Sequence, residues 1–196
     1  EALSAINLTA PAIALITAVS GMLATGGSAV VMKKMGEHKE QEAQQDFTLL
    51  ILTNAVVGTV MMVLGYTLMD TLLGAMGLSP AVFGYCCTYL SNYLLFTIPI
   101  LLMYNFSLYL IAADRSKLSL ICTVAGGVTN IILDYVLIAL FDMGIQGAAI
   151  ATSLGYSLTA VVGFLVFRKK NNLLHFEKPV FRGGVLFHAS TNGMSE

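Results

Sequence analysis

Five long apolar runs limit what this chain can fold into. Each is long enough to cross a hydrocarbon core, which takes about 20 residues as a helix. A helix of a soluble all-helical protein would carry a polar stripe along one face, and these runs show almost none. The predicted membrane spans are Pro11–Met32, Phe47–Met69, Tyr85–Ala113, Leu118–Phe141 and Ala148–Phe167, and a sixth apolar stretch begins near Val185.

The composition agrees with a membrane protein. Of the 196 residues, 57% are hydrophobic and 11% charged, against roughly 25% charged in ordinary soluble domains. We therefore predict an all-α fold, a polytopic transmembrane helical bundle whose first partner is the lipid bilayer. Nucleophile motifs and glycine-rich phosphate loops are absent from the sequence, so neither an enzyme activity nor a cofactor is expected. Nucleic-acid binding has no support, because membrane topology accounts for the basic residues.

The basic residues predict the orientation of the spans. Turns that carry Lys or Arg alternate along the chain with turns that carry none, and basic loops face the cytoplasm. Loops 33–46 and 114–117 and the tail 168–184 are thus expected inside and residue 1 outside, in a multi-pass protein of the plasma membrane. An outside start is unusual, and the chain begins with Glu1 rather than Met. We therefore expect a fragment, with 168–184 as a cytoplasmic linker and 185–196 as the start of a further transmembrane helix.

Asp134 is the only charged residue in its span. A carboxyl at depth costs at least ~2.5–3.5 kcal/mol on insertion scales, and helical rise places it ~24 Å from the inner end. Asn130 lies one turn earlier on the same face, and Thr123 extends that face as a candidate for lining a cavity. Asp134 can take up and release a proton, or ligate Na⁺ together with the Asn130 amide oxygen. The alternative is an aspartate held permanently by a hydrogen bond to a neighbouring helix.

Tyrosines mark one face of the third span. Tyr85, Tyr89 and Tyr93 recur every fourth residue, and Asn92 lies beside them. One interpretation is interhelical hydrogen bonding with an aromatic belt at the membrane surface. The other is that Tyr89, Asn92 and Tyr93 line a cavity suited to planar or cationic ligands.

Three further patterns concern helix packing. Pro99 should kink the third span, and on the packing interpretation Asn105 takes part in interhelical hydrogen bonding. Small residues recur every fourth position in the fifth span, which predicts close packing against a neighbour. These are Gly147, Ala151, Gly155, Thr159 and Gly163.

The motifs around Asp134 resemble a known family. The string Asn130–Asp134, followed by Gly144–Thr152, resembles the multidrug and toxic compound extrusion (MATE) transporters, and the glycine-rich segment from Gly21 to Gly36 is similar to the family's second helix. The resemblance implies twelve spans in two six-helix bundles. This chain would then comprise helices two to six, the linker and the start of helix seven. Its partners would include the remaining helices of the same chain.

The resemblance also implies a function, that of an antiporter that expels small organic, often cationic, compounds in exchange for H⁺ or Na⁺ by alternating access. Asn130 and Asp134 match helix-five residues of a cation site, with no metal expected beyond Na⁺ there, and Glu196 matches a second acid in helix seven. Two alternatives remain open. A lipid-linked sugar flippase of the wider superfamily is disfavoured because no Lys or Arg lies within a span. A non-transporting membrane scaffold predicts that Asp134 can be replaced without loss.

Overall fold

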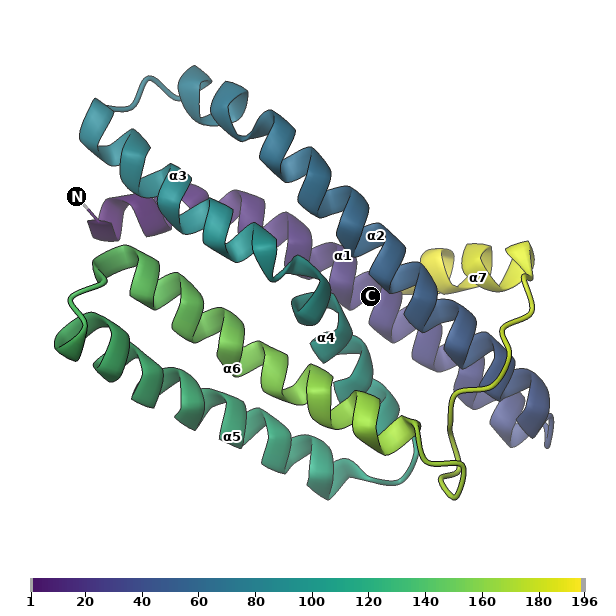
Figure 1. Ribbon diagram of the computed structural model, residues 1–196. Helices are drawn as coiled ribbons and strands as arrows, with labels where there is room; N and C mark the ends of the chain where they lie inside the picture. The colour runs from purple at the N-terminus through teal and green to yellow at the C-terminus, as the bar shows by residue number, and fades with distance from the viewer. Residues whose placement is uncertain (1, 195–196) are drawn as a thin grey trace.

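The computed structural model describes residues 2–194, and all of the regular structure within that range is helical (Figure 1). This confirms the predicted all-α class. The elements are α1 Ala2–Gly36, α2 Glu40–Ala75, α3 Pro80–Leu95, α4 Thr97–Ala112, α5 Ser116–Asp134, the π-helix η1 Tyr135–Leu140, α6 Gly144–Phe167 and α7 Gly183–Met194.

The long helices match membrane dimensions. In the described residues, α1, α2, the continuous α5–η1 segment and α6 are each long and apolar enough to cross a membrane, and α3 with α4 forms a fifth span bent by 53°. Several helices extend beyond the predicted spans: α2 begins at Glu40 and runs to Ala75. The extra turns carry polar residues, which an apolar-run criterion excludes.

The bend between α3 and α4 lies at Phe96. Pro99 explains it, because a proline donates no backbone hydrogen bond and its ring clashes with the carbonyl four residues earlier, that of Leu95. The predicted kink is confirmed, and it falls one turn before the proline.

The small-residue stripe of α6 packs against two helices. A Cβ built on Gly126 of α5 would lie 2.8 Å from the Gly155 carbonyl oxygen, and one on Gly155 would lie 2.8 Å from the Gly126 oxygen. A Cβ on Gly163 would lie 2.4 Å from the Cβ of Phe106 in α4. All five residues of the stripe are buried, so the predicted close packing is confirmed.

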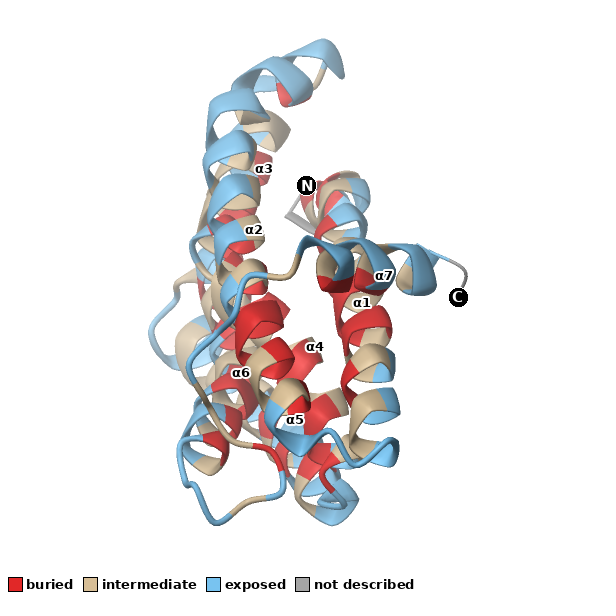
Figure 2. Cartoon of the chain, turned by 90° about the vertical axis from the view of Figure 1, so that its right-hand side faces the viewer, coloured by how far each residue is buried: buried red, intermediate tan, exposed pale blue. Residues whose placement is uncertain are grey.

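Helix α7 lies across α1 (Figures 1 and 2). A Cβ on Gly26 of α1 would lie 1.8 Å from the Ala189 carbonyl oxygen, and one on Gly193 of α7 would lie 2.0 Å from the Met22 carbonyl oxygen. The two backbones are therefore in direct contact, and neither position has room for a side chain.

The linker covers the end of the bundle at which the basic residues gather. We call this end the basic end. Phe176 of the linker stacks on Phe47 of α2 with ring centroids 5.3 Å apart, and Leu174 is fully buried. The Glu177 N–H donates to the Thr48 hydroxyl at 3.0 Å. The linker is therefore packed as part of the bundle. We call its aromatic centre the aromatic cluster: Phe47, Phe106, Tyr109, Phe167 and Phe176.

Two buried asparagines join α2 to α4. The Asn54 amide donates to Asn105 Oδ1 at 3.1 Å, and the Asn105 amide donates to Asn54 Oδ1 at 2.9 Å. Each amide also donates to a carbonyl one turn earlier in its own helix. The expected interhelical hydrogen bond of Asn105 is confirmed, and Asn54 is its partner.

Replacing Asn105 alone with leucine is expected to destabilise the full-length protein by about 1–2 kcal/mol, since it leaves the buried Asn54 amide without its partner. Replacing both asparagines with leucine should cost less than the sum of the two single changes, because no polar group is then stranded. The measurement is unfolding in denaturing mixed micelles. If the losses in unfolding free energy of the two single variants simply added, the two asparagines would not stabilise each other.

Candidate functional site

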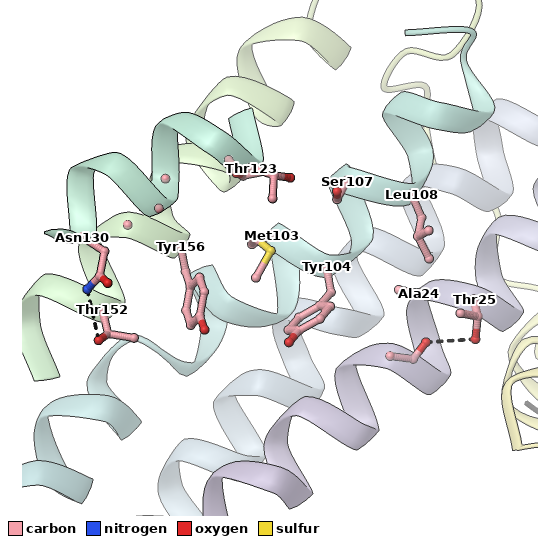
Figure 3. Close-up of a pocket in the computed structure, with 15 residues that line it drawn as sticks. Ala24, Thr25, Met103, Tyr104, Ser107, Leu108, Thr123, Asn130, Thr152 and Tyr156 are labelled. Atoms are coloured by element: carbon pink, nitrogen blue, oxygen red, sulfur yellow. Dashed lines mark hydrogen bonds between the residues drawn. The ribbon is translucent and has the colours of Figure 1, made fainter. Parts of the chain in front are cut away.

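A cavity of about 740 Å³ opens between α1, α4, α5 and α6 (Figure 3). Its walls combine hydroxyl groups, two tyrosine rings and apolar atoms. No charged side chain is present among the lining residues that the structure describes. They are Gly21, Ala24, Thr25, Met103, Tyr104, Ser107, Leu108, Thr123, Gly126, Gly127, Asn130, Thr152, Gly155, Tyr156 and Thr159.

Two tyrosines occupy the middle of this cavity. In Figure 3, Tyr104 of α4 and Tyr156 of α6 lie between the Asn130–Thr152 pair at one end and Thr25 at the other. Gly126 and Gly155 hold α5 against α6 and leave backbone rather than side chains at that wall. The cavity can therefore offer aromatic faces and neutral hydrogen-bonding groups to a ligand.

Of the four side chains expected along a cavity, Thr123 lines this one and three lie elsewhere. Tyr89 and Tyr93 are 7% and 2% exposed and pack into apolar clusters. Their face of α3 meets α1 and α6, so other helices cover it. Asn92 donates to the Thr88 carbonyl of its own helix at 2.7 Å. None of these three residues lines the cavity, and the hydrogen bond of Asn92 stays within its own helix rather than joining two helices.

Asn130 lies at the boundary of the cavity. Its amide nitrogen donates to the Thr152 hydroxyl at 3.3 Å, which connects α5 to α6 (Figure 3). Thr152 belongs to the string that resembles the transporter family, and the structure adds it to the candidate site. Tyr104 and Tyr156 were also missed, because neither falls into a periodic polar pattern.

Asp134 follows Asn130 by one helical turn and is half-buried. It is not among the residues that line the cavity. Its Oδ1 atom is buried and has no hydrogen-bond partner within residues 2–194. A buried acceptor without a partner carries a desolvation cost, and the described residues do not supply the hydrogen bond that the alternative interpretation requires.

The backbone changes its winding immediately after Asp134. Residues Tyr135–Leu140 form a π-helix, and the Phe141 N–H donates to the carbonyl of Val136, five residues back, at 3.0 Å. Short π-segments within helices occur frequently at functional sites. The sequence carries no signal for it, because these six residues continue the apolar run.

A second charged site lies at the basic end. Asp46 of α2 is fully buried, with Lys34 Nζ of α1 at 2.5 Å and Arg182 Nη1 of the linker at 3.3 Å. Both cations also contact Glu42, at 3.1 and 3.2 Å, and Arg182 donates to Gln45 at 3.2 Å. We call Lys34, Glu42, Asp46 and Arg182 the ionic cluster.

This arrangement corrects the expectation of a loop over 33–46. The end of α1 and the first turns of α2 occupy most of that range, and only the turn between Gly36 and Glu40 is free of helix. In the turn, Lys39 pairs with Glu37 at 2.7 Å, and the hydrogen bond and charge of Lys39 lower the pKa of that carboxyl. Such stabilisation is lost as the pH falls through the lowered pKa. The pair is exposed, so its effect is small.

Glu196, the predicted second acid, lies outside the described residues.

Comparison with known proteins places these features in a family. The family model MatE matches residues 1–136. The multidrug export protein MepA of Staphylococcus haemolyticus is 24% identical over 174 residues, 89% of this chain and 38% of that protein. MepA of Staphylococcus saprophyticus is 22% identical over 172 residues, 88% of this chain and 38% of that protein. The chain thus spans little more than a third of the length of these relatives.

Solved structures share the fold. An inward-facing conformation of a multidrug resistance MATE family transporter superposes with a TM-score of 0.92 at 20% identity, over 98% of this chain and 44% of that one. An outward-facing conformation gives 0.89 at 20% identity, over 98% and 45%. With the family model matching most of its length, the chain belongs to the MatE family of membrane transporters.

Proposed function

We propose that this chain forms part of a secondary exporter that expels small organic compounds in exchange for H⁺ or Na⁺. In the full-length protein it supplies one bundle, and a second bundle moves against it to expose the binding site alternately to each side of the membrane. Membership of the MatE family and the likeness to multidrug export proteins support this proposal.

One observation supports Asp134 as the coupling residue. Asp134 presents a buried carboxylate oxygen that has no partner among the described residues, one turn from Asn130 at the edge of the cavity. A carboxylate can bind a proton or a cation only if one of its oxygen atoms is free to accept it. Binding drives transport only if its affinity differs between the outward and inward states. A π-helix follows directly after Asp134, and short π-segments occur frequently at functional sites.

The cavity suggests the substrate class. Tyr104 and Tyr156 offer ring faces that attract organic cations, and the neutral hydroxyl groups around them can bind varied compounds. The described lining carries no Lys or Arg, which a flippase for an anionic, lipid-linked sugar would use. The site therefore favours planar or cationic organic compounds.

The proposed orientation follows the positive-inside rule. The basic end faces the cytoplasm, and Asp134 lies toward the outer side of the plasma membrane. There it meets the external proton or Na⁺ reservoir, as an exporter driven by inward cation flow requires.

The test uses the full-length protein in proteoliposomes that contain a fluorescent organic cation. Imposing a proton or Na⁺ gradient should drive dye movement in the wild type, and Asp134→Asn should reduce that movement to background. Asp142→Asn is the matched control, since Asp142 is an exposed turn residue at φ 52, a conformation that asparagine tolerates. Unchanged gradient-driven transport by Asp134→Asn would support a scaffold instead.

Thr152→Val separates the two coupling ions. The Thr152 hydroxyl accepts the Asn130 amide hydrogen bond, and Na⁺ needs several oxygen ligands. Losing this bond should displace Asn130, a proposed ligand, and raise the Na⁺ concentration required for transport. Under proton coupling the carboxyl alone titrates, and the same substitution should leave the pH dependence in place.

A further inference from the structure

A groove at the basic end has the chemistry of a phospholipid site. It has a volume of about 350 Å³ and lies where the start of α5 meets the end of α6 and the first linker residues. Polar groups of Arg115, Lys169, Asn171 and Asn172 form one part of its wall. Val162, Leu165 and Val166 of α6 form the rest.

The charge around this groove is not neutralised. The ionic cluster balances two cations with two carboxylates. By contrast, in the part of the chain that the structure describes, no ion pair involves the five bases near the groove. The two segments that carry them, 113–119 and 165–172, contain one acid, the exposed Asp114. We call these bases the basic corner: Arg115, Lys117, Arg168, Lys169 and Lys170.

Specific hydrogen bonds hold the walls of the groove in place. Arg115 donates to the Asn172 side-chain oxygen, and the Asn172 amide donates to the Val166 carbonyl. These two bonds fix the guanidinium of one loop beside the other loop and leave most of its five N–H groups free. The Phe167 carbonyl also accepts a bond, from the Phe176 N–H at 3.0 Å. The Val166 and Phe167 carbonyls are therefore both hydrogen-bonded within the protein.

The apolar part of the groove continues into an exposed face of α6. Val161 and Leu165 are 56% and 53% exposed, and they lie one turn apart on a helix that is long and apolar enough to cross a membrane. A ligand bound here thus meets cations at the membrane surface and apolar side chains below them. Basic pockets between helices at that depth bind anionic lipid headgroups.

We propose that this groove binds the headgroup phosphate of an anionic phospholipid from the leaflet that the basic end faces, with an acyl chain along Val161 and Leu165. Orientation rules explain why bases lie on this side of the membrane. They do not require a fixed arginine, a groove and an apolar exit in one place.

The test measures lipid retention by the full-length protein with native mass spectrometry. Short-chain phosphatidylglycerol should bind more tightly than phosphatidylcholine of the same chain length. Arg115→Gln with Lys169→Gln should weaken phosphatidylglycerol binding roughly thirty-fold, since each base near an anionic headgroup contributes about a factor of five.

The matched control is Arg168→Gln with Lys170→Gln, which removes the same charge from the same corner but from residues that do not line the groove. It should retain most of the affinity. Equal losses in both double variants would show diffuse attraction and overturn the site. Inorganic phosphate that competes as strongly as the lipid would also overturn the site. So would equal binding of phosphatidylcholine and phosphatidylglycerol, the result expected if another part of the full-length protein fills the groove.

Discussion

Replacing Asp46 with alanine is expected to destabilise the full-length protein by about 3–5 kcal/mol, because it removes the buried partner of the ion pairs and leaves two partly buried cations with a single carboxylate. Asp46 is fully buried, whereas the Lys34 and Arg182 side chains that it neutralises are 19% and 33% exposed. Without it, Glu42 alone would face two cations. The change would loosen both the α1–α2 contact and the linker. Unfolding in mixed micelles should therefore begin at a lower denaturant fraction.

Glu42→Ala is the matched control for that experiment. Glu42 contacts the same two cations, but its side chain is 46% exposed, so its loss should cost no more than about 1 kcal/mol. Similar costs for the two substitutions would mean that the burial of Asp46 has no energetic consequence.

Replacing Gly26 with valine is expected to displace α7 from α1. Its Cβ would overlap the Ala189 carbonyl oxygen, at 1.8 Å, and the Gly193 nitrogen, at 2.7 Å. Both obstacles are backbone atoms, which cannot rotate away. Overpacking of this kind costs about 1–3 kcal/mol and occasionally more, and in a membrane close backbone packing is a main source of helix association. Stability and gradient-driven transport should both fall.

Gly21→Val makes the same chemical change in the same helix. Nothing lies within 4 Å of a Cβ at Gly21, so the variant should retain its stability. A loss equal to that of Gly26→Val would point to helix propensity as the cause, rather than to the contact with α7.

Local patterns in the sequence were sufficient to predict much of the fold. Apolar run length predicted a helical membrane bundle, Pro99 predicted the bend, and the small-residue stripe of α6 predicted close packing. Each depends on residues within a few turns of one another. The stripe could not reveal its partners, because Gly155 meets Gly126 and Gly163 meets Phe106 only through the tertiary arrangement.

The sites were less predictable for the same reason. Asp46 resembles a solvated residue beside a basic turn, and Arg182, which contacts it, is 136 positions away. Spacing alone could not reveal that other helices bury Tyr89 and Tyr93 of α3 while Tyr85 stays exposed. Asn130 and Asp134 stood out because a membrane makes a polar side chain costly, whereas Tyr104 and Tyr156 carry no such penalty and gave no signal.

The packed linker has a consequence for how the chain is made. Phe176 and Arg182 follow all of α1–α6 in the chain, yet they complete the aromatic cluster around Phe47 and the ionic cluster around Asp46. A ribosome delivers these residues only after the six preceding helices have been synthesised. Until then Asp46 has Lys34 but lacks Arg182, and Phe47 lacks its stacking partner. Assembly of the basic end is therefore a late step of biogenesis. A nascent chain halted before residue 176 lacks the residues that complete the aromatic and ionic clusters there.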